Sequence, residues 1–183
     1  MWIVDPIDGT RAYIAGRNDW SISAALVEEG RPIVAAIFAP VTDEMFLGTA
    51  GGGAFCNDEP LAATESDILA GAHITGPRRV LERLAQAEPG LVAAPRVHSL
   101  ALRFARVAQG RLDGALAGSN SFDWDLAAAD LLVHEAGGML TTLAGEPIVY
   151  NRRLPTHGPL VAAGISRHRA LTNLLREQLI ELP

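Results

Sequence analysis

The sequence has a single cysteine and no long apolar run, and each shortage excludes a class of protein. Cys56 stands alone among 183 residues, so an intrachain disulfide framework is excluded and a reducing compartment is favoured. We interpret Cys56 as a small buried apolar side chain and not as a nucleophile. No apolar stretch is long enough to span a bilayer, and no signal-peptide pattern is present. We therefore expect a cytoplasmic protein that does not enter the membrane.

The chain also lacks any block of like charges. Its formal net charge is −6 and charged residues make up 20% of the sequence, a balance that disfavours nonspecific binding to nucleic acid polymers or anionic membranes. Hydrophobic residues make up 49%, which is typical of a globular chain. A length of 183 residues suffices for one domain with a real core and is too short for two. We predict a single domain over residues 1–183.

Apolar periodicity and turn signals predict a β-rich first half followed by helices. The expected strands cover residues 2–5, 20–27, 32–38, 45–49, 53–55 and 112–116. A hairpin turn is expected at Glu28-Glu29-Gly30. The expected helices cover residues 79–87, 100–109, 126–136 and 168–180, and the apolar face of the last comprises Leu171, Leu174, Leu175 and Ile180.

The most informative motif lies almost at the N-terminus, where Asp5-Pro6-Ile7-Asp8-Gly9-Thr10 follows a short apolar run. Pro6 biases Asp5 toward extended geometry, so the strand should run to Asp5 and then turn. Carboxylates and a turn carbonyl are ligands that suit Mg²⁺, and backbone N–H groups at Gly9 and Thr10, if they open a helix, attract phosphate. The alternative is an acidic turn that caps a helix through Asp8 or Thr10 without a metal.

A second acidic segment, Ser121-Phe122-Asp123-Trp124-Asp125, precedes an Ala-rich pattern that ends at Gly137-Gly138. This pattern predicts a helix that is stopped by the two glycines. Asp123 and Asp125 fall at or near its N-cap, where a carboxylate accepts backbone N–H groups or points at a cation. Taken alone, each aspartate is explained by a helix cap.

Together, the two segments resemble the signatures of the inositol monophosphatase superfamily of metal-dependent phosphatases. Residues 2–10 are similar to its first signature, Trp-x-x-Asp-Pro-Ile/Leu-Asp-Gly-Thr. Residues 124–138 are similar to its second, in which Trp-Asp-x-Ala-Ala leads into a helix ending in Glu-Ala-Gly-Gly. Residues 51–57 and 106–113 fit the family as well, so the resemblance spans nearly the whole chain. It implies a layered α/β/α/β sandwich of the sugar-phosphatase type.

The resemblance implies hydrolysis of a small phosphomonoester by water that is activated by two or three Mg²⁺ ions. Asp5 would bridge two metals, the Ile7 carbonyl would bind the first, and Asp8 and Asp125 would bind the second. Thr10 would orient the attacking water, and its amide and that of Gly9 would hold phosphate oxygens. The implied site comprises the metal ligands Asp5, Ile7, Asp8 and Asp125, the catalytic residues Asp5 and Thr10, and the substrate-binding residues Asp8, Gly9, Thr10, Ser99 and Asp125.

The resemblance implies that the substrate is a small phosphorylated metabolite, such as an inositol phosphate or adenosine 3',5'-bisphosphate. Residues 118–121 lack the glutamate that inositol-specific members place before the second signature, which weakens inositol phosphate as the substrate. Residues 11–16 look closer to bacterial 3'(2'),5'-bisphosphate nucleotidase or histidinol-phosphatase relatives. The arginines at 11, 17 and 96 are candidate contacts to a second phosphate, although surface solvation is the better explanation of each alone. His98 departs from the family pattern, and His134 is interpreted as a helix-face residue.

In the family, a substantial segment precedes the first signature and supplies two helices, the first strands, a metal-binding glutamate and an aspartate partner for the threonine. Here Met1 is followed directly by Trp2, so we expect an N-terminally truncated fold with an exposed apolar sheet face that favours self-association. The alternative function is therefore a catalytically impaired fragment that folds or functions only as an oligomer, such as a homodimer, or with a partner. A Ca²⁺-binding module is disfavoured because no EF-hand spacing follows Asp5.

Overall fold

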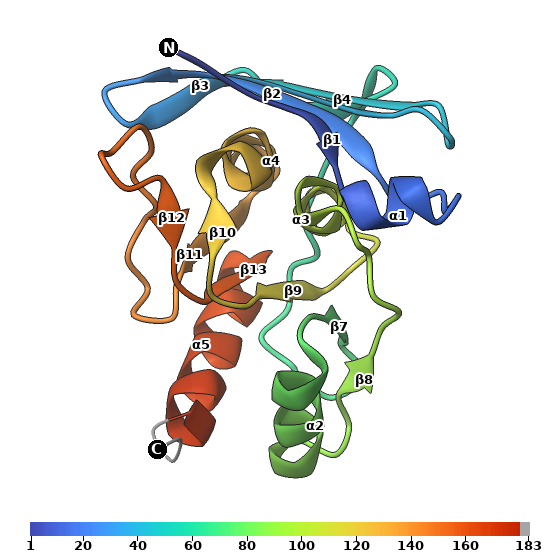
Figure 1. Ribbon diagram of the computed structural model, residues 1–183. Helices are drawn as coiled ribbons and strands as arrows, with labels where there is room; N and C mark the ends of the chain where they lie inside the picture. The colour runs from blue at the N-terminus through green and yellow to red at the C-terminus, as the bar shows by residue number, and fades with distance from the viewer. Residues whose placement is uncertain (180–183) are drawn as a thin grey trace.

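Four layers of helix and sheet make up the fold in a computed structural model that describes residues 1–179 (Figure 1). A six-stranded sheet covers a layer formed by helices α3 (Leu100–Ala108) and α4 (Asp123–Glu135). A five-stranded sheet lies on the other side of these helices, and α2 (Arg78–Ala87) and α5 (Ile165–Leu179) form the outer layer. The layering confirms the predicted α/β/α/β sandwich.

The six-stranded sheet is antiparallel throughout and follows the chain order. Its strands are β1 (Trp2–Asp8), β2 (Ser21–Glu28), β3 (Arg31–Ala39), β4 (Glu44–Thr49), β5 (Gly53–Cys56) and β6 (Glu59–Pro60), with the short helix α1 (Thr10–Ile14) after β1. Glu29 and Gly30 join β2 to β3 with φ values of 48° and 78°. Positive φ at both positions of a two-residue loop is typical of a type I′ hairpin, so the predicted hairpin is confirmed.

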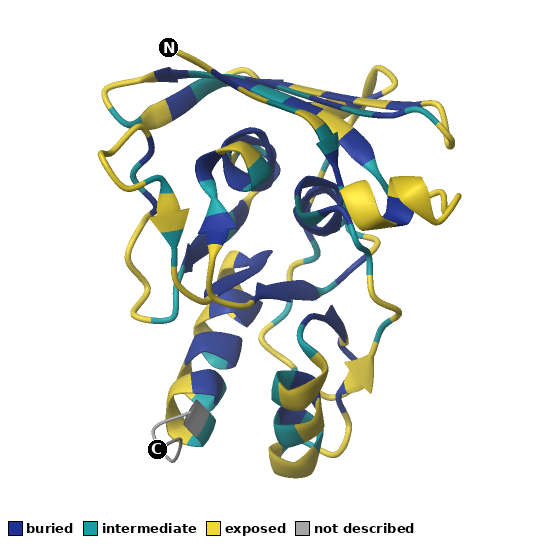
Figure 2. Cartoon of the chain, viewed as in Figure 1, coloured by how far each residue is buried: buried dark blue, intermediate teal, exposed yellow. Residues whose placement is uncertain are grey.

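Residues along the strands of this sheet alternate between buried and more exposed positions (Figure 2), because successive side chains point to opposite faces. The inner face packs on α3 and α4, because alternate residues such as Ala25, Ile37 and Phe46 point toward these helices. The outer face is uncovered in the described part of the chain. Its exposed large apolar side chains are Trp2, Val4, Ile22, Met45, Leu47 and Phe55. The exposed apolar face that the sequence predicted is therefore present.

The five-stranded sheet is mixed and has the order β11-β13-β9-β7-β8. Its strands are β7 (His73–Thr75), β8 (Val92–Ala93), β9 (Gly114–Ala117), β11 (Gly138–Thr142) and β13 (Leu160–Gly164). A separate antiparallel pair consists of β10 (Ser121–Phe122) and β12 (Thr156–His157). The pair places β10 directly before α4, so it fixes where that helix begins.

Apolar side chains of α3 and α4 form the main core between the two sheets. Phe104, Leu126 and Leu132 are fully buried, as expected for helices that are covered on both sides. On α5, Leu171 and Leu175 are buried and Leu174 is half-buried, so the predicted apolar face is confirmed for these residues; Ile180 lies outside the described residues. No helix within residues 1–179 is both long and apolar enough to cross a membrane.

Three predicted boundaries are wrong by three residues: the end of β1, the start of α4 and the start of α5, which begins at Ile165 and not at His168. Strand β1 does not stop at Asp5 but continues to Asp8, because Pro6 lies in an edge strand, where a missing N–H group is tolerated. Helix α4 begins at Asp123, three residues before the predicted start at Leu126. Its first turn is polar, so apolar periodicity does not detect it.

Candidate metal centre

Three carboxylates from two distant segments meet at one end of the six-stranded sheet. Asp5 and Asp8 lie on β1, and Asp125 lies in the first turn of α4. One carboxylate oxygen from each lies within 4.8 Å of the others. The structure thus brings together the three carboxylates that were predicted as metal ligands.

A bulge in β1 puts the side chains of Asp5 and Asp8 on the same face of the sheet. Asp5 pairs with Ser23 and Asp8 pairs with Ser21, so three steps along β1 match two steps along β2. A regular strand would put residues three apart on opposite faces, and one extra residue removes that difference. The Asp5 carboxylate also accepts a hydrogen bond from the Ile7 amide at 2.9 Å. The motif is therefore a bulged strand end and not the turn that was predicted.

The start of α3 donates hydrogen bonds to the Asp8 carboxylate. Its Oδ2 accepts hydrogen bonds from the Ser99 hydroxyl at 2.5 Å and from the Ala101 amide at 2.7 Å. The Ser99 Oγ also accepts the Leu102 amide as the N-cap of α3 and lies 2.9 Å from the Ser21 Oγ. Because Ser99 is fully buried, it reaches the cluster through Asp8, and its predicted contact with substrate stays a prediction.

Asp125 and Asp123 have different surroundings although they are two residues apart. The Asp125 carboxylate accepts the Phe122 amide at 2.7 Å, which fixes it at the N-terminus of α4. The Asp123 carboxylate instead contacts the His157 ring at 2.6 Å and accepts the Asn151 amide at 2.8 Å. Asp123 thus lies at the start of α4, as predicted, but its carboxylate is paired away from the cluster and does not cap the helix.

Gly9 and Thr10 shape the turn that follows the bulge. Gly9 has φ of 85°, and a Cβ atom there would lie 3.0 Å from the Ser99 nitrogen. Only glycine combines this left-handed backbone with such a close approach. The exposed Thr10 donates its hydroxyl to the Ile7 carbonyl oxygen at 3.0 Å, so these two predicted site residues lie side by side.

Burial and like charge make the cluster electrostatically unfavourable by itself. Burial raises the pKa of Asp8 to about 7, with a further upward contribution from the Asp125 charge. Burial also raises the pKa of Asp125, as does the nearby Asp5 charge, and burial raises that of Asp5. Carboxylates that destabilise one another in this way are stabilised by a bound cation.

The cluster opens into a cleft of about 640 Å³. One wall comes from residues 9–17, the second from residues 96–103 and the third from residues 117–121. His98 is fixed in this cleft by Asp19, whose Oδ2 lies 2.6 Å from its Nδ1 and accepts its amide at 2.8 Å. Asp19 was not predicted, because its partner lies 79 residues away along the chain.

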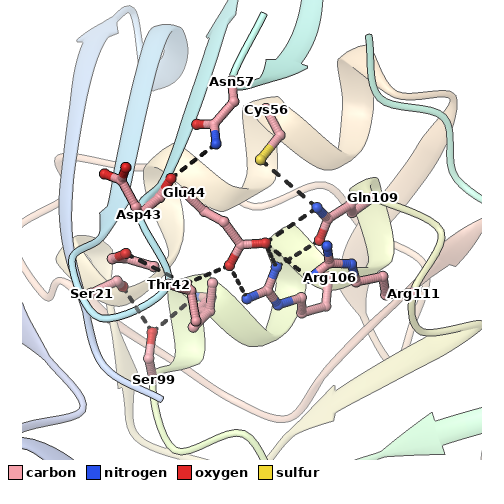
Figure 3. A network of polar contacts seen from close by, with 12 residues as sticks. Ser21, Thr42, Asp43, Glu44, Cys56, Asn57, Ser99, Arg106, Gln109 and Arg111 are labelled. Atoms are coloured by element: carbon pink, nitrogen blue, oxygen red, sulfur yellow. Dashed lines mark hydrogen bonds and ion pairs between the residues drawn. The ribbon is translucent and has the colours of Figure 1, made fainter. Parts of the chain in front are cut away.

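An ion-pair network anchors α3 to the sheet and so supports the position of Asp8 (Figure 3). Glu44, the first residue of β4, accepts hydrogen bonds from the Arg106 guanidinium at 2.6 and 2.5 Å, and from Arg111 at 2.9 Å. Thr42 donates to the same carboxylate at 2.6 Å. Charge-assisted bidentate pairs of this kind have a defined geometry, so the network fixes the helix whose N-cap holds Asp8.

Two other residues singled out in the sequence, His134 and Cys56, do not line the cleft beside the cluster. His134 lines a separate cavity of about 410 Å³ between the start of β3, the end of α4 and β11. Cys56 is buried, as predicted. The arginines at positions 11, 17 and 96 line the cleft itself.

The fold and the cluster define an α/β sandwich protein with an all-oxygen acidic site. The inositol monophosphatase family matches residues 1–181, and the chain belongs to this family. An inositol-1-monophosphatase of Rhizobium meliloti is 37% identical over 153 residues, which cover 79% of this chain and 57% of the relative. A histidinol-phosphatase of Mycobacterium tuberculosis is 34% identical over 156 residues, which cover 79% of this chain and 60% of the relative.

A solved structure confirms the fold. The inositol monophosphatase from Anabaena superposes with a TM-score of 0.83 and 30% identity, over 97% of this chain and 74% of that one. The chain thus spans about three fifths of the length of the two sequence relatives, with 57% and 60% of their residues matched.

Proposed function

We propose that this chain contributes the metal-binding and phosphate-binding site of a Mg²⁺-dependent phosphatase that hydrolyses a small phosphomonoester. The observation that carries the proposal is the meeting of Asp5, Asp8 and Asp125 within 4.8 Å, beside a cleft that Asp8 and Asp125 line together with arginines. The relatives named for inositol phosphate and histidinol phosphate support the same reaction class.

The donor set fits a hard divalent cation. All of its side-chain donors are carboxylate oxygens, and the Ile7 carbonyl oxygen, which accepts the Thr10 hydroxyl, is the further oxygen ligand of this proposal. Mg²⁺ prefers such oxygen donors. The pKa values of the three aspartates are raised, which means that their ionised forms are destabilised when no cation is bound. When bound, Mg²⁺ supplies charge stabilisation for phosphate and lowers the pKa of water.

The residues of the chain divide the remaining work. Asp5, Asp8 and Asp125 hold the metal, the amides of Gly9 and Thr10 hold phosphate oxygens, and the Thr10 hydroxyl orients water. In the hydrolysis, a bond forms between the water oxygen and phosphorus, and the bond from phosphorus to the alcohol oxygen breaks. A water proton passes to the departing alcohol. Positioning and electrostatic stabilisation account for most of the catalysis in such reactions.

Phosphate release from a panel of phosphomonoesters tests the proposal. The complete gene product is assayed with inositol 1-phosphate, histidinol phosphate, adenosine 3',5'-bisphosphate and fructose 1,6-bisphosphate, with Mg²⁺ and with EDTA. We expect Mg²⁺-dependent release that Asp5→Asn lowers by at least about 100-fold, while Asp67→Asn, at an exposed residue, leaves it unchanged. Release that persists in EDTA, or no release from any ester, would overturn the proposal.

The uncovered sheet face supports a second proposal, that the chain works in contact with another protein surface, such as a second copy in a homodimer. Trp2 is 60% exposed and Val4 is 53% exposed on that face, and contiguous apolar patches of this kind mark interaction sites. Sedimentation of the protein at several concentrations measures its oligomeric state and tests this second proposal. A monomer that unfolds cooperatively and turns over substrate would contradict this proposal.

A further inference from the structure

The cleft beside the acidic cluster carries more positive charge than one phosphate requires. Arg11 and Arg17 come from α1 and the loop after it, and Arg96 comes from the segment before α3. All three are exposed and line the same cleft as Asp8 and Asp125. Three cations from two separate segments therefore face one space.

Two of these cations have no carboxylate of their own. Within residues 1–179, neither Arg11 nor Arg96 forms an ion pair. Arg17 has a single contact, to Asp19 at 3.2 Å, and stays 53% exposed. Asp19 is also held by His98, so it leaves Arg17 only partly neutralised.

A fourth arginine in the cleft is not free to bind an anion. The Arg103 guanidinium is buried and donates to the Val97 carbonyl oxygen at 2.6 and 2.9 Å and to that of Leu116 at 3.0 Å. Burial, and after it the positive charge of Arg96, lower the pKa of Arg103 to about 10. The positive charge of Arg96 therefore acts on a buried group that lines the cleft.

The far wall adds no negative charge. Residues 117–121, which form it, are Ala, Gly, Ser, Asn and Ser. The carboxylates that line the cleft are Asp8 and Asp125, and both belong to the acidic cluster. The space between the cluster and the arginines is thus positive and polar, and it suits a negatively charged group.

We propose that this cleft selects a phosphomonoester that carries a second anionic group, which Arg11, Arg17 and Arg96 bind while the acidic cluster holds the phosphate that is released. The inference rests on the proposed function and names its substrate class. Guanidinium groups bind phosphate and carboxylate with paired hydrogen bonds. A neutral polyol phosphate leaves the arginines unused, and the amine of histidinol phosphate is repelled by them.

Matched substrates that differ by one phosphate test the proposal. The complete gene product is assayed with fructose 1,6-bisphosphate and fructose 1-phosphate, and the ratio of the two kcat/KM values is compared between variants. Each variant loses a charge-assisted hydrogen bond to the second phosphate, so we expect Arg96→Gln and Arg11→Gln each to lower the ratio by about tenfold or more. Arg79→Gln, at an exposed residue of α2, is the control and leaves the ratio unchanged. Equal losses for both substrates, or a wild-type ratio near one, would overturn the inference.

A binding measurement separates failure of this inference from failure of the proposed function. Calorimetric titration of each fructose phosphate in the presence of Ca²⁺ needs no turnover. Tighter binding of the bisphosphate, lost in Arg96→Gln, supports the arginine site even if no phosphate is released from any ester. Equal affinities for the two fructose phosphates overturn the inference. A loss of affinity in Arg96→Gln that Arg79→Gln reproduces also overturns it, because the arginines of the cleft would then behave as solvated surface residues.

Discussion

Replacing Glu44 by glutamine removes the negative charge that joins β4 to α3. Glutamine keeps the shape and one acceptor oxygen, but the two bonds from Arg106 at 2.6 and 2.5 Å lose their ionic partner. The hydrogen bond from Arg106 is the largest cause that lowers the pKa of Glu44 from 4.5 to about 2. At about 1.4 kcal/mol per pKa unit, this shift corresponds to roughly 3 kcal/mol. Arg111 is 59% exposed, so solvent screening reduces the expected loss to about 2 kcal/mol.

The same network predicts the pH dependence of stability. The folded pKa of Glu44 lies below its unfolded value of 4.5, so its contribution is complete above that pH and is lost as the pH falls toward 2. The difference in free energy of unfolding between the wild type and Glu44→Gln should therefore be constant from pH 8 to pH 5. It should shrink as the pH falls from 4.5 toward 2.

Urea unfolding at several pH values measures this difference. Glu65→Gln, at an exposed residue, is the matched control and should change the free energy of unfolding by less than about 0.5 kcal/mol. A loss of about 2 kcal/mol at pH 7 that fades below pH 4.5 supports the reasoning. A Glu44→Gln protein as stable as the wild type at pH 7, or a difference that does not change with pH, would refute it.

Two further predictions concern Gly9 and Asp130. Gly9→Ala should lower the free energy of unfolding by about 2 kcal/mol. The left-handed backbone costs alanine about 1 kcal/mol, and the steric contact of the new Cβ atom, 3.0 Å from the Ser99 nitrogen, accounts for the rest. Gly16→Ala, with positive φ but open space, should show only the backbone cost, and equal losses in urea unfolding would contradict the contact. Burial raises the pKa of Asp130 to about 7, so its ionisation destabilises the fold as the pH rises above 3.8. Asp130→Asn should therefore be more stable than the wild type by about 2 kcal/mol at pH 8, and a gain in thermal midpoint that persists at pH 4 would argue against this cause.

Local sequence predicts strands β1 to β5 and helices α2 to α5, because each has its own periodicity or turn signal. The two-residue strand β6 and the five-residue helix α1 were not predicted. The hairpin at Glu29-Gly30 needs positive φ at both positions, and the helices of the middle layer are rich in alanine and leucine. β7, β8, β10 and β12 have two or three residues each, too few to show a period. β11 and β13 were not predicted either: β13 is an apolar run of five residues, which does not distinguish strand from helix, and β11 contains only two large apolar residues, Met139 and Leu140.

The ligands of the candidate site could be predicted, but their supports could not. Asp5, Asp8 and Asp125 lie in contiguous motifs that resemble the family signatures. Asp19 and its partner His98 are 79 residues apart, and Asp123 and His157 are 34 residues apart. No local sequence pattern links such partners. The bulge in β1 is likewise set by its pairing with β2, and the motif alone suggested a turn.

Direct titration with Mg²⁺ tests the central claim that the three aspartates form one cation site. Isothermal titration calorimetry is carried out on the complete gene product at pH 8, with Asp125→Asn and with the exposed-site control Asp67→Asn. We predict that Asp125→Asn weakens Mg²⁺ binding by at least about tenfold, because it removes one of three charged donors, and that Asp67→Asn binds as the wild type does. Mg²⁺ binding with the same affinity in Asp125→Asn, or weakened to the same extent in Asp67→Asn, would contradict the account.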